Sequence, residues 1–313
     1  MLSTVVVAGG SGFVGREVVA RLVSAGYRVI VPARRREAAR RLILLPTVDV
    51  HECDVTDPPT LLRLLRGADA MINLVGILNP AGRDTFTRLH VDFARDAVAA
   101  CAAQGVARYL QMSAINADAA GPSAYLRSKG EAEAIVAASP LAWTILRSNV
   151  IFGRDDSLLN KFVLLGRLMP VIALGAADAT LQPVWVQDVA DCFVAALATD
   201  ATIGQRYELC GPRRYALREL VKWTLDTAEM PRPVLPLPTG LARMAAAILQ
   251  RLPGRLLTRD NLDSLSVAAV CREPFPPVFG LEPSSLEALA PAWLSPDLRR
   301  SRYDDFRAEV GRS

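Results

Sequence analysis

Tyr125 and Lys129 are the two residues of this chain whose types and spacing point most directly to chemistry. On a helix, residues four apart lie on the same face, so the Lys129 ammonium would stand beside the Tyr125 hydroxyl and favour its ionised form. A phenol tuned in this way can exchange a proton with a bound substrate near neutral pH. The chain has six tyrosines and three lysines, so a chance Tyr-x-x-x-Lys match is rare.

Ser113 is the candidate third member of this catalytic set. It directly follows a predicted strand, where its hydroxyl could hold a substrate carbonyl or alcohol, although serine also caps turns and helices at such positions. The chain has two histidines, His51 and His90, and they are too isolated for a metal centre or a Ser-His-Asp triad. We therefore expect both histidines to be structural and predict no metal site.

The element that must position a cofactor against these residues lies at residues 4–34. An apolar run, a glycine turn, an amphipathic stretch and a second apolar run predict strand, turn, helix and strand. Gly9 allows the tight turn, Gly12 lets the backbone approach a pyrophosphate, and Gly15 lets the helix pack closely. The helix N-terminus, which includes Phe13 and Val14, offers N–H groups to the anion. This pattern predicts a dinucleotide site.

The residues after the second strand favour NADPH over NADH. An Asp or Glu there usually accepts the ribose hydroxyls of NAD, whereas Arg accommodates the 2′-phosphate of NADP. Here Arg34 and Arg35 follow the strand, and no acid comes before Glu37. We expect Arg40 and Arg41 to lie on a solvated helix face, and without interleaved aromatic residues these arginines do not indicate a nucleic-acid site.

The strand and helix pattern continues and predicts an α/β fold. Alternation of this kind indicates a doubly wound parallel sheet, a Rossmann fold, with its ligand at the carboxyl ends of the strands. The further predicted strands are Val48–Cys53, Ala70–Leu74, Arg108–Met112 and Trp143–Leu146.

Two strand ends add candidate cofactor contacts. Asp54 and Val55 follow the third strand and are expected to meet the adenine. Asn73, Val75 and Gly76 end the fourth strand and are expected to line the nicotinamide side. Ordinary turn chemistry is the alternative explanation for each of them.

Prolines break the pattern after Gly153 and predict a second, smaller domain. We expect residues 1–153 to form the dinucleotide-binding domain, with residues 181–200 returning to it. Residues 154–180 and 201–295 would form an interleaved lid domain over the strand ends. Residues 296–313 would form a C-terminal tail helix.

One segment of the predicted lid, between residues 233 and 257, is an amphipathic helix with cationic flanks. Packing within the lid explains its apolar stripe, and a helix that faces a membrane surface or a quinone is the alternative. The apolar residues at helical spacing are Leu241, Met244, Ala245, Ile248 and Leu252.

Composition places few further limits on function. The net charge of +4 gives no strong case for an acidic partner, and the apolar fraction of 51% predicts a globular protein. The first strand begins too early to leave room for a signal peptide, and no apolar stretch reaches the length that spans a bilayer. The five cysteines form no Cys-x-x-Cys pair and are expected to be small buried residues in a reducing, cytoplasmic setting: Cys53, Cys101, Cys192, Cys210 and Cys271.

The glycine turn and the Tyr-x-x-x-Lys motif together resemble the short-chain dehydrogenase/reductase superfamily, in its extended or atypical form. More narrowly, the chain is similar to the family of the NADPH-binding accessory subunit of respiratory complex I and its bacterial relatives. The similar segments are Gly9–Arg16, Asn73–Gly76, Tyr125–Lys129, Ile151–Asp156 and Cys210–Tyr215.

This resemblance implies tight NADPH binding and a link to quinone or respiratory metabolism, with contact to a respiratory complex or to the periphery of the inner membrane. Two hypotheses follow. In the first, the protein is an oxidoreductase of a small-molecule substrate or quinone, with Tyr125 as proton donor or acceptor. In the second, it is a non-catalytic NADPH-binding assembly or sensor protein. The short segment between Ser113 and Tyr125 argues against sugar-nucleotide epimerase activity.

Overall fold

The computed structural model describes residues 3–251 and 257–296, which divide into two units. The first unit contains residues up to 149, residues 186–210 and residues 271–282. Its centre is a sheet of seven parallel strands in the order β11-β6-β5-β4-β1-β2-β3, which confirms the predicted Rossmann-like fold. The strands are β1 (Thr4–Ala8), β2 (Arg28–Ala33), β3 (Val48–Glu52), β4 (Ala70–Asn73), β5 (Arg108–Ala114), β6 (Ala142–Ser148) and β11 (Gln205–Leu209).

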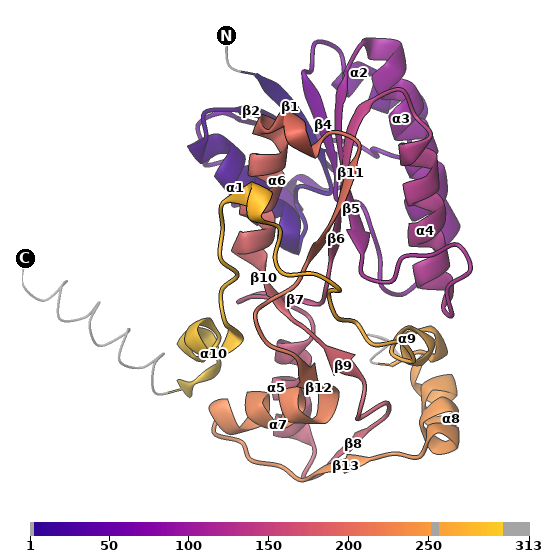
Figure 1. Ribbon diagram of the computed structural model, residues 1–313, viewed down its shortest axis with the longest axis vertical. Helices are drawn as coiled ribbons and strands as arrows, with labels where there is room; N and C mark the ends of the chain where they lie inside the picture. The colour runs from indigo at the N-terminus through magenta and orange to yellow at the C-terminus, as the bar shows by residue number, and fades with distance from the viewer. Residues whose placement is uncertain (1–2, 252–256, 297–313) are drawn as a thin grey trace, which may run out of the picture. The chain divides into compact units, whose positions relative to one another are not determined.

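Helices cover both faces of this sheet, as Figure 1 shows. α1 (Phe13–Ser24) and α6 (Val186–Ala198) lie on one face, and α2 (Pro58–Leu64), α3 (Phe93–Gln104) and α4 (Ala124–Ala137) lie on the other. Strands buried on both faces read as continuous apolar runs, and Val5–Ala8 of β1 are fully buried in this way. Short helical segments complete the unit: η1 (Arg36–Ala39), η2 (Thr87–Asp92), η3 (Asp200–Thr202) and η4 (Pro277–Phe279).

The strand order reverses between β1 and β4, and this reversal positions the site. β1 pairs with β2 on one side and with β4 on the other, with Ala8 opposite Asn73. The loops that follow β1 and β4 therefore leave the sheet at the same edge. In open parallel sheets, ligands bind at the carboxyl ends of the strands where the order reverses.

The second unit contains residues 150–185, 211–270 and 283 onward. Its strands are β7 (Ile151–Phe152), β8 (Ile172–Leu174), β9 (Thr180–Leu181), β10 (Val184–Trp185), β12 (Tyr215–Ala216) and β13 (Val234–Pro236). Its helices are α5 (Leu159–Leu168), α7 (Leu217–Thr227), α8 (Thr239–Leu249), α9 (Arg259–Ser264), α10 (Leu286–Leu289) and α11 (Pro291–Leu294). Its core includes Phe152, Leu220 and Leu225.

This division differs from the predicted one at β11. Sequence reasoning assigns residues 201–295 to the lid, but residues 205–209 pair with β6 in parallel and extend the central sheet. Pairing between strands so distant in sequence leaves no local signal. The predicted tail helix lies, apart from residue 296, outside the described residues.

The apolar stripe of α8 faces outward, so the expectation that it packs within the lid is wrong. Its packed side carries Ala242 and Ala246, which are buried in a small cluster with Leu262. Its large side chains are exposed: Leu241 by 50%, Met244 by 59% and Ile248 by 62%. Alanine packs there because space is short, since a Cβ added at Gly175 would lie 2.9 Å from the Ala242 Cβ. Leu252 lies outside the described residues.

Two of the five cysteines form a disulfide, which corrects the expectation of five reduced thiols. Cys210, directly after β11, is joined to Cys271 across a separation of 61 residues. A pairing over such a distance follows no short motif, which is why the spacing did not reveal it. Cys101 and Cys192 are buried as predicted, whereas Cys53 is only partly buried. Since disulfides form mainly in oxidising compartments, the cysteines no longer support a reducing setting.

Within the described part of the chain, none of the helices is long and apolar enough to cross a membrane.

Candidate functional site

The glycine turn between β1 and α1 has the conformation that the sequence predicts. Gly9 has a φ of +81°, and a Cβ there would lie 2.9 Å from the carbonyl of Leu74. A Cβ on Gly15 would collide with the Gly9 carbonyl oxygen. The tight turn at Gly9 and the close helix packing at Gly15 are therefore confirmed.

Gly12 leaves the space that a phosphate needs. A Cβ added there would meet only the Gly9 carbonyl oxygen, at 3.2 Å, and nothing else within 4 Å. Gly12 is also the N-cap of α1, and no side chain caps the helix or places an acid in its first turn. The first N–H groups of a helix, here those of Phe13 and Val14, lack partners within the helix. These features fit a pyrophosphate, and contact with one stays a prediction.

The loop after β4 is held by the side chain of Asn73. Its Nδ2 donates to the Tyr109 hydroxyl and to Gln111 Oε1, both at 3.0 Å, and its Oδ1 accepts from the Val75 N–H at 3.0 Å. The Asn73 amide is fully buried, so it shapes the loop from behind. The predicted contacts of this loop with a nicotinamide therefore depend on its backbone, on Val75 and on Gly76.

Lys129 on α4 reaches this loop at Gly76. A Cβ added to Gly76 would lie 3.3 Å from Lys129 Nζ, so the absence of a side chain leaves the ammonium directly beside the loop backbone. Lys129 Nζ also donates to the Met112 carbonyl oxygen at 3.4 Å. Burial lowers the pKa of Lys129 to about 8, although Glu133 one turn further along α4 acts to raise it. The predicted lysine thus lies at the sheet edge where the strand order reverses.

His90, in the π-helical segment η2, joins the same cluster and is fully buried. Its Nε2 accepts the Ile77 N–H at 3.1 Å, so the ring proton must reside on Nδ1, which donates to Ser128 Oγ at 2.8 Å. The Ser128 hydroxyl in turn donates to the Tyr125 carbonyl oxygen at 2.7 Å. Burial, with a contribution from Lys129, lowers the pKa of His90 to about 2.

This hydrogen-bond chain gives His90 the structural role that the sequence predicts. The sequence does not reveal where His90 lies. A neutral imidazole ties the loop after β4 to the helix that carries Tyr125 and Lys129. Nothing in the local sequence signals the contact, because residues 77, 90 and 128 come from three separate elements.

The ring of Tyr125 packs against the imidazole of His90 in η2 and against the ring of Phe86, which directly precedes η2. Its ring centroid lies 5.8 Å from those of His90 and Phe86. Burial raises the pKa of Tyr125 to about 12, so the expectation that Lys129 favours its ionised form is wrong for this structure. The physical reason is that burial disfavours the phenolate, while burial also lowers the pKa of the Lys129 ammonium. Tyr125 is a protonated phenol at neutral pH.

Ser113 donates its hydroxyl to a buried carboxylate. Its Oγ lies 2.5 Å from Glu133 Oε1 on α4, and the two Glu133 oxygens also accept from Arg147 at 2.8 and 2.6 Å. The Nε of Arg206, in β11, lies 3.3 Å from Glu133 Oε2, so two arginines donate to this carboxylate. Side chains alternate along a strand, so the next residue, Ala114, points to the opposite face of the sheet. Alanine has no hydroxyl that could take the place of Ser113 there. The predicted role of Ser113 in holding substrate stays a prediction: to donate to a substrate carbonyl the hydroxyl must leave Glu133, whereas it can accept from a substrate alcohol in place.

Sequence reasoning missed Glu133, although a signal was present. Tyr125, Lys129 and Glu133 follow one another at intervals of four on α4, which places all three on one helix face. Arg147 and Arg206 come from β6 and β11 and carry no such signal.

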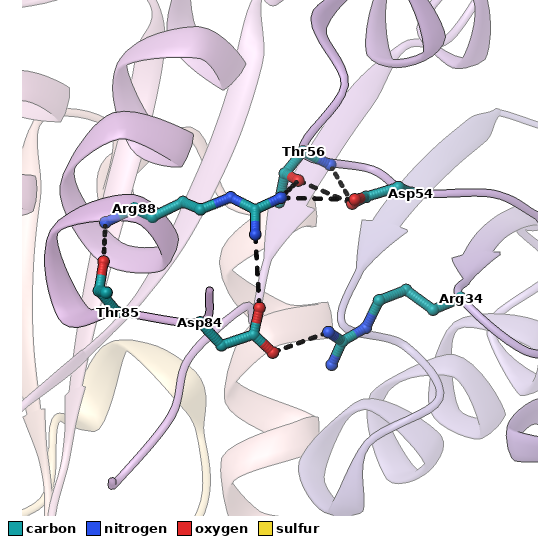
Figure 2. A network of polar contacts seen from close by, with 6 residues as sticks. All are labelled: Arg34, Asp54, Thr56, Asp84, Thr85 and Arg88. Atoms are coloured by element: carbon teal, nitrogen blue, oxygen red, sulfur yellow. Dashed lines mark hydrogen bonds and ion pairs between the residues drawn. The ribbon is translucent and has the colours of Figure 1, made fainter. Parts of the chain in front are cut away.

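A second polar cluster joins residues that follow β2, β3 and β4 (Figure 2). Arg34 Nη1 lies 2.8 Å from Asp84 Oδ2, and Arg88 Nη1 lies 3.6 Å from Asp84 Oδ1. Asp54 accepts from the backbone N–H and hydroxyl of Thr56, at 3.0 and 2.7 Å, and from Arg88 at 3.5 Å. Partial burial acts to raise the pKa of Asp54, but these hydrogen bonds and the arginine charges lower it overall.

The other two predicted residues of this region differ in burial. Arg35 is exposed and directly precedes η1, whereas Val55 is partly buried and packs against the core of the first unit. Asp84 and Arg88 are polar residues of this cluster that sequence reasoning missed. Among the described residues, no group of three or more His, Cys, Asp or Glu side chains could hold a metal ion.

Comparison with known proteins places this geometry in context. The profile of a family described as NAD(P)H-binding matches residues 9–200. The mitochondrial NADH dehydrogenase [ubiquinone] 1 alpha subcomplex subunit 9 of Arabidopsis thaliana is 35% identical over 249 residues, 76% of this chain and 61% of that protein. A ceramide reductase of Caulobacter vibrioides is 31% identical over 192 residues, 61% of this chain and 60% of that protein. The chain thus spans about three fifths of the length of these two relatives.

Among solved structures, a nucleoside-diphosphate-sugar epimerase from Staphylococcus aureus superposes with a TM-score of 0.73 and 17% identity. The match covers 91% of this chain and 98% of the epimerase. At this identity the likeness concerns the fold alone.

Proposed function

The chain belongs to the NAD(P)H-binding family, and we propose that it is an NADPH-dependent oxidoreductase that reduces a carbonyl or quinone substrate. The predicted resemblance to the complex I accessory-subunit family is confirmed. The observation that carries the proposal is the cluster at Gly76, where Lys129 Nζ meets the loop after β4 and Tyr125 lies one helical turn away. A relative named ceramide reductase supports a reductive activity.

In the proposed reaction, this chain binds the nucleotide and supplies the proton. NADPH, when bound, would supply a hydride to the substrate carbon. Tyr125, whose pKa of about 12 keeps it protonated, would donate its hydroxyl proton to the substrate oxygen and recover it from solvent. Lys129 would hydrogen-bond the nicotinamide ribose. The glycine turn and the first turn of α1 would bind the pyrophosphate.

Tyr125→Phe tests the catalytic part of this proposal. The change removes one hydroxyl and little volume, so NADPH affinity should remain while turnover falls roughly 10²- to 10⁴-fold. Loss of nicotinamide absorbance against a panel of ketones, lipid ketones and quinones measures turnover, and a binding titration measures affinity. Tyr27→Phe, outside the cluster, is the matched control. A Tyr125→Phe protein with undiminished turnover would contradict the assigned role.

The second candidate is a non-catalytic NADPH-binding protein, and the Ser113 contact favours it. The hydroxyl expected to hold substrate is bound to Glu133 instead, and Ala114 offers none on the other face. This candidate predicts that the wild-type protein keeps NADPH bound and unoxidised with every member of the panel. Tyr125→Phe would then leave its cellular role intact, whereas Gly12→Val would abolish it.

The preference for NADPH over NADH forms part of the proposal. Arg34 and Arg35 follow β2, where a 2′-phosphate would be recognised, and both are exposed. Replacing both with Asp should reverse or abolish the preference, because each change removes a cationic donor and adds repulsion. Arg40→Asp with Arg41→Asp makes the same change in net charge nearby and should leave the preference intact. Equal affinities of the wild-type protein for the two nucleotides would refute the preference.

We further propose that the protein attaches peripherally to an anionic lipid surface through α8. The exposed side chains of Leu241, Met244 and Ile248 share one helix face, and burying such a face in lipid removes apolar area from water. Residues 230–258 contain four Arg and no Asp or Glu, which suits negatively charged headgroups, although one of the four, Arg243, is paired with Asp263 of α9. Relatives named as a ceramide reductase and as a mitochondrial subunit support this location.

Vesicle flotation tests the attachment. The wild-type protein should float with vesicles that contain an anionic phospholipid and much less with purely zwitterionic ones. Changing Leu241, Met244 and Ile248 to Ser should abolish flotation, whereas changing the exposed Leu164 and Leu168 of α5 to Ser should not. Equal flotation of both variants would assign attachment to another surface, and no flotation of the wild type would refute it.

A further inference from the structure

Two arginines of the first unit face a single carboxylate at the carboxyl edge of the sheet. Figure 2 shows Asp84 between Arg34, which follows β2, and Arg88 of η2. One Asp84 oxygen lies 2.8 Å from Arg34 Nη1 and the other lies 3.6 Å from Arg88 Nη1. Arg88 Nη2 also donates to Thr56 Oγ1 at 2.8 Å. The arrangement resembles an anion held between two guanidinium groups, with a protein carboxylate as the anion.

Asp84 lies in a turn closed by backbone hydrogen bonds, whereas the Arg34 side chain is largely exposed. The N–H and carbonyl groups of Ala81 and Asp84 bond each other at 2.9 and 3.0 Å and close a small turn that ends at Asp84. The Asp84 side chain is 23% exposed, but that of Arg34 is 68% exposed. Arg34 can therefore turn to another partner while Asp84 stays in place.

The 2′-phosphate of NADPH is the stronger partner for these arginines. A phosphate monoester carries about −1.5 to −2 charges at neutral pH and three acceptor oxygens, whereas the Asp84 carboxylate carries one charge and two oxygens. Arginine recognises both, and the more highly charged anion makes the stronger charge-assisted bonds. NADH presents only a 2′-hydroxyl, which can donate to a carboxylate and does not repel it.

We propose that Asp84 is an internal counter-ion of the nucleotide site, which holds Arg34 until a 2′-phosphate displaces it and which thereby limits the preference for NADPH. The inference rests on the proposed NADPH-binding function and adds a specificity-determining residue to it. Asp84 competes with the phosphate for Arg34, and this competition weakens NADPH binding without weakening NADH binding. Arg88 serves as the second cationic group that faces the phosphate.

Titration of NADPH and NADH into the purified full chain tests this role. Asp84→Asn keeps the shape of the side chain and removes its charge, so NADPH affinity should rise roughly 3- to 10-fold at low salt while NADH affinity stays level or falls. Asp49→Asn is the matched control, because Asp49 forms a similar exposed ion pair with Arg28 at the amino ends of β2 and β3. The control should change neither affinity.

A double-mutant cycle with Arg34→Gln separates competition from a general field effect. In that background Asp84→Asn should raise NADPH affinity less than 2-fold, because the contested arginine is absent. A full gain without Arg34, or no gain in the single variant, would overturn the role of Asp84 and leave the proposed function standing. Failure of the wild-type chain to bind either nucleotide would overturn both.

Discussion

Replacing Lys129 with Met should stabilise the fold while it weakens nucleotide binding. Lys129 is almost completely buried, and burial lowers its pKa from 10.5 to about 8. Because one pKa unit corresponds to about 1.36 kcal/mol, the buried ammonium costs the folded state about 3 kcal/mol at neutral pH. Methionine has a similar length and no charge. The free energy of unfolding should therefore rise by up to about 3 kcal/mol.

The gain should depend on pH in one direction. Below about pH 8 the lysine is protonated in both folded and unfolded chains, and the full penalty applies. Between about pH 8 and 10.5 the folded chain releases the proton while the unfolded chain keeps it, so wild-type stability rises with pH. The advantage of Lys129→Met should shrink to about 1 kcal/mol near pH 9.5.

Urea unfolding of the wild-type and variant proteins at neutral pH and near pH 9.5 measures both quantities. Lys222→Met on α7 is the matched control, because Lys222 is exposed, and it should change stability by less than about 0.5 kcal/mol at either pH. A variant no more stable than the wild type, or a gain that does not change with pH, would refute the link between burial and this lysine. Retention of full NADPH affinity would refute its contact with the ribose.

Three further outcomes follow from the structure. Gly12→Val should abolish nucleotide binding with little loss of circular dichroism, because the side chain fills the open space beside the α1 N-terminus; nucleotide retained through purification would place the site elsewhere. The wild-type protein should lose about 2 kcal/mol of stability between about pH 6.5 and pH 5, since unfolding lets His90, with its folded pKa of about 2, take up a proton. Thermal or urea unfolding of His90→Gln should show a weaker acid dependence and that of the exposed His51→Gln an unchanged one; identical pH profiles for all three would disprove the assignment. Replacing Cys210 and Cys271 with Ser should lower unfolding stability by roughly 2–4 kcal/mol, as for closure of a long loop, and by more than Cys53→Ser does; equal effects would show that the disulfide contributes nothing.

Features that depend on local pattern could be predicted from the sequence. The apolar run Val5–Ala8 forms a buried strand, the glycines after it form the tight turn, and the spacing of Tyr125 and Lys129 places both on one helix. Each follows from a few consecutive residues whose backbone and side-chain periods are fixed by geometry.

Features that depend on partners distant in the sequence could not be predicted from it. β11 becomes a strand of the central sheet only by pairing with β6, and Cys210 finds Cys271 across 61 residues. The apolar stripe on α8 correctly predicted a helix, but the prediction of which face packs was wrong. The space beside Gly175 admits only the small side chain of alanine. The pKa of Tyr125 is raised through burial by neighbouring elements, which the local sequence does not reveal.

Because α6 and β11 come late in the chain, they are synthesised after most of the first unit, and this affects folding on the ribosome. Residues 1–149 contain the glycine turn and the Tyr125 cluster. The sheet face that carries α1 is also covered by α6, and Arg21 of α1 forms an ion pair with Asp191 of α6 at 2.9 Å. A nascent chain that ends before residue 186 would expose the apolar side of α1 and of the sheet to solvent. The nucleotide-binding half is therefore not a separable module, and a fragment cut at residue 149 should aggregate where the full chain folds.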